Sequence, residues 1–194
     1  MGLPLMIAGL VLFIGVHVFT TIRGQRAALI ARVGEGAYKG VYSLLSIVGV
    51  VLIAWGFARY RAAGYIAIWD PPGWTRHVTV LLVWPAIIMF YAAYSPGRIK
   101  AVLKHPMLVG TKLWALAHLI SNGDLGSIVL FGSILAWAVY DRITLKRRTD
   151  AGGPPIPVGG TKQDIIAVVG GTIIYLLLGF LFHPYVVGVL AFGR

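Results

Sequence analysis

Five histidines carry most of the chemistry available to this chain, and two of them fall deep inside apolar sequence. His17 lies in the uncharged stretch Gly2–Ile22, and His118 is eleven residues into Met107–Ser121. An imidazole at membrane depth is costly, so each of these side chains needs a hydrogen bond or a ligand. From the residue types alone, a helix–helix hydrogen bond and ligation of a metal or cofactor are both open.

The other three histidines have simpler expected roles. His77 and His105 follow Arg76 and Lys104 at the ends of apolar stretches, where we expect them to contact water. His105 is kept as a further candidate for the site. His183 precedes Pro184, and we expect it to bond a carbonyl that the proline break leaves without a donor.

Helix geometry limits which histidines can act together. His105 and His118 are thirteen residues apart, which on an α-helix is an advance of roughly 20 Å and a rotation of about 220°. These two side chains therefore cannot share one metal ion. His118 needs a partner on another helix, and His17 is the best-buried candidate.

Two imidazoles from separate helices suit a b-type haem. The macrocycle needs an apolar slot, and its iron accepts two neutral nitrogens. Zinc normally takes a third or fourth protein ligand, and this chain has no cysteine and only six acidic residues. On residue types alone, His17 and His118 therefore suit the iron of a haem b cofactor, with Trp114 as a further cofactor-binding candidate, and the helix–helix hydrogen bond stays open.

The pairing of His17 with His118 requires the two side chains to lie at similar depths in the membrane. If the first helix ends at Ile22, His17 lies about 8 Å from the cytoplasmic end and His118 about 17 Å from it. The two depths agree better if the first helix continues toward Arg32, or if the fourth begins near Lys112.

The composition predicts the surroundings of these histidines. The chain has 194 residues, of which 58% are hydrophobic and 12% charged, and its mean hydropathy is +0.84. We predict an all-α, polytopic integral membrane bundle of about six helices that forms one domain over residues 1–194. The predicted spans are Gly2–Ile22, Val41–Ala58, His77–Tyr94, Met107–Ser121, Leu125–Tyr140 and Ile165–Phe182.

The basic residues predict the orientation, because lysine and arginine in short loops stay in the cytoplasm. Twelve of the fifteen basic loop residues fall in the first, third and fifth loops, and the even loops hold Arg59, Arg61 and Arg76. Both termini are therefore expected on the outer side. The net charge of +11 is spread over these loops, so we expect anionic lipid headgroups as partners rather than nucleic acid.

Two loops have distinct compositions. Residues 149–164 are rich in glycine and proline and are expected to be a linker. The segment YIAIWDPPGWTRH combines Tyr65, Trp69 and Trp74 with a Pro-Pro break. It is typical of an interfacial aromatic belt, and a lid over a substrate entrance is the alternative.

Several of these stretches together resemble one family. They are His17 in the first span, YKGVYSLLSIVG in the second, and IKAVLKHPMLVGTKLWALAH followed by GDLGSIVLFGSILAWAVYDRITLKRR. They are similar to the NnrU family, whose relatives include the plant and cyanobacterial 15-cis-ζ-carotene isomerase. The resemblance implies a protein of the bacterial inner membrane, where the outer side expected for both termini is the periplasm.

The resemblance implies two kinds of activity. One is a role in nitrite and nitric oxide metabolism during denitrification. The other is a haem-dependent isomerase that acts on a hydrophobic polyene, with the iron ligands on His17 and His118 as catalytic residues and the His-Pro histidine on His105. The isomerase carries a cysteine one turn before the second ligand, where this chain has Ala115. This difference weakens a ligand-switching mechanism.

Two other functions stay open on the sequence. KHPMLVG also resembles the entry to the membrane methyltransferases that bind S-adenosylmethionine, although those continue into a glutamate-bearing helix and this chain has only Glu35. A non-catalytic assembly protein, whose histidines only hold helices together, is the other alternative.

Overall fold

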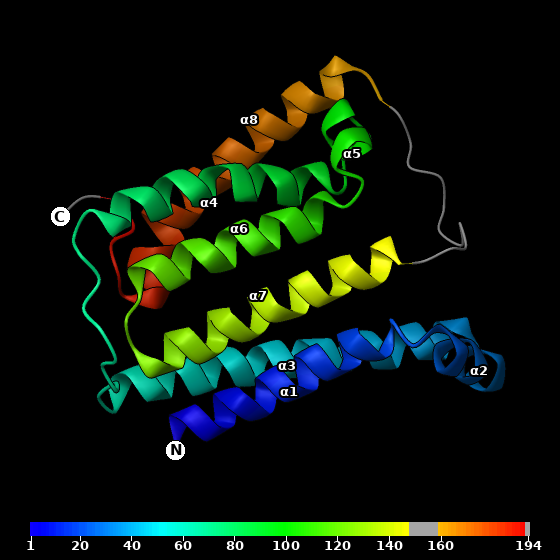
Figure 1. Cartoon of the computed structure of the whole chain (residues 1–194), viewed down its shortest axis with the longest axis horizontal. Helices are drawn as coiled ribbons and strands as arrows, with labels where there is room; N and C mark the ends of the chain where they lie inside the picture. The colour runs from blue at the N-terminus through cyan, green and yellow to red at the C-terminus, as the bar shows by residue number, and fades with distance from the viewer. Residues whose placement is uncertain (148–158, 193–194) are drawn as a thin grey trace. The chain divides into compact units, whose positions relative to one another are not determined.

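The described residues fold into helices, in agreement with the predicted all-α class. The computed structural model describes residues 1–147 and 159–192, and within these ranges no β-strand forms (Figure 1). The elements are α1 (Gly2–Phe19), α2 (Arg23–Val33), α3 (Glu35–Ala62), α4 (Thr75–Ala92), α5 (Arg98–Leu103), α6 (Pro106–Ser121), α7 (Leu125–Lys146), α8 (Thr161–Leu177) and the π-helix η1 (Leu178–Val187).

Five helical segments are long and apolar enough to cross a membrane. They are Gly2–Phe19, Glu35–Ala62, Thr75–Ala92, Leu125–Lys146 and Thr161–Val187. The remaining predicted span, Met107–Ser121, corresponds to α6, which has 16 residues. The prediction of about six membrane helices thus agrees with the structure.

The helix ends differ from the predicted ones near the histidines. The first helix stops at Phe19, where the hydroxyls of Thr20 and Thr21 bond the carbonyls of His17 and Val18. Ile22 then leaves the helical conformation, and α2 starts separately at Arg23. The fourth predicted span starts as α6 at Pro106 and not near Lys112. The first helix therefore does not continue toward Arg32, and the fourth predicted span does not begin near Lys112. These are the two conditions under which we expect His17 and His118 to lie at similar depths.

The helices form two compact units. Unit 1 contains residues 1–69 and 124–146, and unit 2 contains residues 70–123 with the described residues from 147 onward. The predicted single domain stays a prediction. Of the predicted linker, residues 149–158 lie outside the described part, and residues 161–164 already belong to α8.

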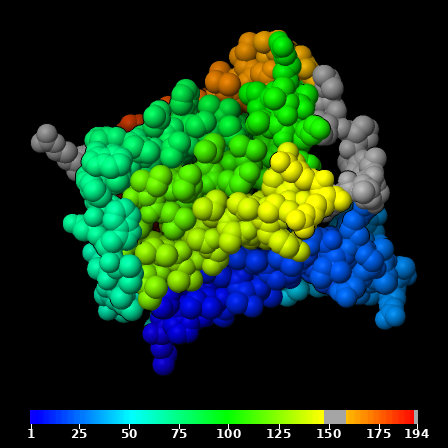
Figure 2. Space-filling model, viewed as in Figure 1, coloured from blue at the N-terminus to red at the C-terminus, as the bar shows by residue number. Residues whose placement is uncertain are grey.

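Glycines bring α1 and α3 of unit 1 into close contact. A side chain at Gly9 would place its Cβ 2.6 Å from the backbone nitrogen of Ile53, and one at Gly49 would place it 2.9 Å from Cβ of Phe13. Helices in lipid associate through such close backbone approach. The α7 helix packs on α1, and Figure 2 shows its yellow atoms directly against the blue atoms of α1.

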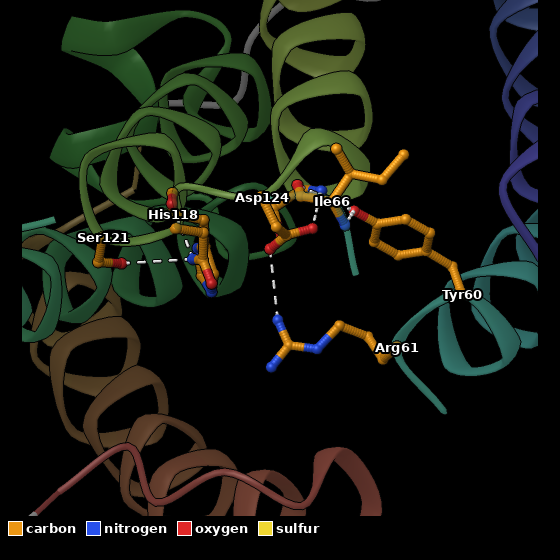
Figure 3. Close-up of polar contacts among 8 residues, drawn as sticks. Tyr60, Arg61, Ile66, His118, Ser121 and Asp124 are labelled. Atoms are coloured by element: carbon orange, nitrogen blue, oxygen red, sulfur yellow. Dashed lines mark hydrogen bonds and ion pairs between the residues drawn. The ribbon is translucent and has the colours of Figure 1, made fainter. Parts of the chain in front are cut away.

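A polar network fixes the start of α7 in unit 1. The buried carboxylate of Asp124 accepts hydrogen bonds from the backbone N–H of Ser127 at 2.9 Å and from its hydroxyl at 2.6 Å. Arg61 lies 3.3 Å from the same carboxylate. Figure 3 shows Arg61 pointing to Asp124 and Tyr60 pointing to Ile66. The carboxylate caps the helix N-terminus and pairs with a cation at once.

The segment around Tyr65 follows this network. Ile66 accepts a bond from the backbone of Leu125 at 2.9 Å, and Ala67 pairs with Asp124 in an isolated bridge. Tyr65, Trp69 and Trp74 are all exposed, as an interfacial aromatic belt requires.

Unit 2 contains α4, α5, α6, α8 and η1. Small residues again allow close contact, since a Cβ at Gly171 of α8 would lie 2.6 Å from Cα of Ile88 in α4. Two hydroxyls bond carbonyls of neighbouring helices, Thr79 to Ala117 at 2.8 Å and Tyr175 to Val80 at 3.0 Å. These bonds hold α6 and α8 against α4 within the unit.

The exposed faces of the long helices are apolar. On α3, Val41, Leu44, Ile47, Val51 and Trp55 are more than half exposed and recur every three or four residues. Such a stripe matches one face of a helix. The hydrophobic surface therefore fits hydrocarbon and not water.

The glycine contact between α1 and α3 yields the first prediction. Gly9→Ala places a methyl group against the α3 backbone and should cost about 1–3 kcal/mol through overpacking. Gly15→Ala on the same helix meets nothing within 4 Å, so it should gain up to about 1 kcal/mol of helix propensity. Thermal unfolding in detergent measures both. Equal melting temperatures for the two variants would contradict the close contact.

Candidate functional site

The structure places three histidines inside helices and two near helix ends. His17 lies in α1, His118 in α6 and His183 in η1, and all three are half-buried. His77 is exposed in the first turn of α4, as predicted. His105 is the half-buried N-cap residue of α6.

The three helical histidines share one hydrogen-bond arrangement. Nδ1 of His17 bonds the Phe13 carbonyl at 2.6 Å, Nδ1 of His118 bonds the Trp114 carbonyl at 2.8 Å, and Nδ1 of His183 bonds the Leu178 carbonyl at 2.9 Å. A carbonyl oxygen only accepts, so Nδ1 carries the proton in each ring and Nε2 carries the lone pair of the neutral form. Metal-binding histidines commonly have this arrangement, which orients the ring.

His183 does bond a carbonyl through its side chain, but the acceptor is Leu178 and not a carbonyl that Pro184 leaves without a donor. The acceptor is five residues earlier, because the chain here winds as a π-helix. The helix ends at Gly188, whose positive φ allows the Val189 N–H to reach the His183 carbonyl.

His17 lies within an aromatic cluster of unit 1. Its ring centroid is 4.2 Å from that of Phe13, 5.1 Å from Trp137 of α7 and 5.3 Å from Tyr42 of α3. Within the described part of the chain, the only hydrogen bond of the His17 ring runs inside its own helix. Ring packing, and not a helix–helix hydrogen bond, connects His17 to the neighbouring helices.

Two polar atoms near this cluster are buried without a hydrogen-bond partner among the described residues. They are the Tyr38 hydroxyl and Nε1 of Trp137. Tyr38 is 8% exposed, stacks 6.4 Å from Tyr42, and lies under the guanidinium of Arg26 at 5.5 Å. A buried donor without an acceptor costs free energy, so these atoms mark the cluster as a place where a polar ligand atom would be stabilised.

His118 lies in unit 2 with Trp114 one turn earlier on the same helix. Trp114 provides the carbonyl acceptor, and its ring centroid lies 5.0 Å from that of His118. Ala115 is fully buried, so its small side chain belongs to the packed face of α6. The ring distance and the carbonyl bond show that Trp114 contacts the candidate ligand His118 directly.

The structure also brings together two histidines that sequence reasoning kept apart. The ring centroids of His118 and His183 are 6.5 Å apart and their planes are inclined by 22°. The Phe182 ring lies 6.0 Å from His183 at nearly a right angle. The sequence contains one signal from which this pair could be inferred. Both histidines fall near the predicted outer ends of their spans.

Among the described residues, no third metal-binding side chain joins these histidines. Across residues 1–147 and 159–192, no group of three His, Cys, Asp or Glu side chains has the geometry to hold a metal ion. Two imidazoles alone suit a centre whose remaining ligands come from a cofactor.

The unpartnered hydroxyl yields a matched prediction on α3. Tyr60 is as buried as Tyr38, but its hydroxyl accepts a bond from the Ile66 N–H at 2.9 Å. Tyr60→Phe should cost about 1 kcal/mol of stability, whereas Tyr38→Phe should be neutral or stabilising because it removes an unsatisfied group. Chemical unfolding of the cofactor-free chain distinguishes them. A larger loss for Tyr38→Phe would show that its hydroxyl has a partner.

Comparison with known proteins identifies the family. The model of the family described as NnrU protein matches residues 5–191, nearly the whole chain. No curated protein and no solved structure matches the chain. Because the match covers almost all of its helices, this chain belongs to the NnrU family, and its long apolar helices make it an integral membrane member of that family.

Proposed function

We propose that this NnrU-family protein binds haem b within the membrane, with His118 as one axial ligand of the iron. The observation that carries the proposal is the bond from Nδ1 of His118 to the Trp114 carbonyl. This bond selects the tautomer whose Nε2 can ligate iron, and it orients the ring. Trp114 supplies both the acceptor and a ring beside the imidazole.

The available donors support haem better than a bare metal ion. The chain has no cysteine, and in the described ranges three metal-binding side chains never converge. A haem supplies four nitrogen ligands to its own iron, so the protein needs to supply at most two ligands. When bound, it would supply an iron that changes oxidation state and accepts a small ligand or interacts with a double bond.

We propose redox-dependent chemistry on an uncharged substrate at this centre. The two candidate classes are a hydrophobic polyene, as in carotenoid isomerisation, and nitric oxide, as in denitrification. Both can reach a buried site through lipid without a charged channel. The protein would then have its catalytic centre at the iron, with Trp114 packed beside the ligand.

Two histidines are candidates for the axial position opposite His118. His17, which lies in unit 1, is the partner predicted from the sequence. His183 is the partner that contacts His118 within unit 2.

We further propose a location in the bacterial inner membrane with periplasmic termini. In unit 1, the Thr21–Tyr140 contact at 3.3 Å brings the end of α1 close to the last turns of α7. Basic residues gather at this end: Arg23, Arg26, Arg32, Lys39, Arg142 and Lys146. The opposite end of α3 has Arg59 and Arg61, and Arg61 is paired with Asp124. The asymmetry supports a cytoplasmic location for the basic end.

The haem proposal predicts a b-type spectrum. Detergent-purified wild-type protein, analysed as the pyridine haemochrome and as a reduced-minus-oxidised difference, should contain about one haem per chain. His118→Ala should lose at least 90% of it because an axial bond is removed. His77→Ala is the control, since this side chain is exposed. A colourless wild type after haem supplementation would refute haem binding and favour the assembly role.

The absence of cysteine makes the topology directly measurable in the full chain. Single cysteines at Tyr65 and Val33, which are 55% and 49% exposed, can be labelled with an impermeant maleimide in right-side-out vesicles. We expect Tyr65→Cys to react from outside and Val33→Cys to react only after the vesicles are opened. The reverse pattern would invert the orientation.

A further inference from the structure

The His118–His183 pair has the spacing of two imidazoles on opposite sides of one metal. A metal–imidazole bond is about 2 Å long, so with the radius of each ring the centroids of two trans ligands lie roughly 6 Å apart. The observed separation is 6.5 Å, with the ring planes within 22° of parallel. The centroid separation of the two rings is therefore close to the one that two ligands of a shared iron would have.

The backbone prepares both rings in the same way. Each Nδ1 donates to a carbonyl of its own helix, at 2.8 Å for His118 and 2.9 Å for His183. In both rings the proton is thereby assigned to Nδ1, and Nε2 is the atom suited to ligation. Two neutral imidazoles in the same tautomer match the donor set of a bis-histidine haem.

The position of His183 depends on an unusual piece of helix. The π-helix η1 runs from Leu178 to Val187 and contains Pro184, which lacks a backbone N–H. The imidazole of His183 supplies a donor to the Leu178 carbonyl in this stretch. A π-helix changes the angular position of the side chains that it contains, and here the result is a histidine against α6.

Unit 2 holds this part of the chain by contacts of its own. Arg76 at the start of α4 donates to the carbonyls of Leu190 and Ala191, just after η1. Phe192 packs 4.7 Å from Phe180 and 5.3 Å from Tyr175. The segment that carries His183 is thus fixed at both ends against the unit that carries His118.

We propose that His183 is the second axial ligand, opposite His118. The proposal rests on the haem proposed above and assigns its second imidazole. In this assignment His17 is not a ligand. Its ring packs against Tyr42 of α3 and Trp137 of α7 and so holds α1 against these two helices. Both ligands come from the same unit, α6 providing one and η1 the other.

The test compares three single variants in the full chain. Absorbance and electron paramagnetic resonance spectra of the haem-loaded protein report the number of axial ligands. We expect six-coordinate, low-spin haem in wild type and in His17→Ala. In His183→Ala and in His118→Ala, the haem that is retained should become five-coordinate and high-spin, because each variant lacks one axial bond.

Added imidazole separates a missing ligand from a misfolded chain. If His183→Ala only lacks a ligand, millimolar imidazole should restore at least 80% of the low-spin signal. His77→Ala provides the control for a histidine away from the pair. Haem that stays low-spin in His183→Ala but turns high-spin in His17→Ala would overturn this assignment and leave haem binding intact. Wild-type protein without haem would overturn both proposals.

Discussion

A polar atom surrounded by apolar helices must find its partner inside the protein, and this constraint shapes both units. The bilayer offers no water to a buried imidazole or carboxylate. His17, His118 and His183 meet the constraint with a carbonyl of their own helix. Asp124 meets it with Ser127 and Arg61. The same bonds that satisfy the rings also determine which nitrogen can ligate a metal.

The second requirement is close contact between helices that gain no hydrophobic free energy from one another in lipid. Glycines meet it, Gly9 and Gly49 between α1 and α3 and Gly171 between α8 and α4. The remaining faces are covered with exposed aliphatic side chains.

The sequence predicted the class of fold and most helices because a span needs only length and apolarity. It did not predict where the first helix ends, since Thr20 and Thr21 terminate it through side-chain bonds at Phe19. Trp114 and His118 could be predicted as neighbours because they are one turn apart on α6. The cluster of His17 with Tyr42 and Trp137 joins three helices distant in sequence, so spacing alone does not reveal it.

The sequence by itself determined that this is a helical membrane protein, that it resembles the NnrU family, and that histidine is its main candidate ligand. Composition and local motifs are sufficient for these conclusions, because apolar length and residue type do not depend on how helices pack. Only the tertiary structure decided that His183 stands against His118 at 6.5 Å. That pairing depends on a π-helix around Pro184 and on the packing of unit 2. A shift from α- to π-winding rotates a side chain around its helix without leaving a periodic signal in the residues.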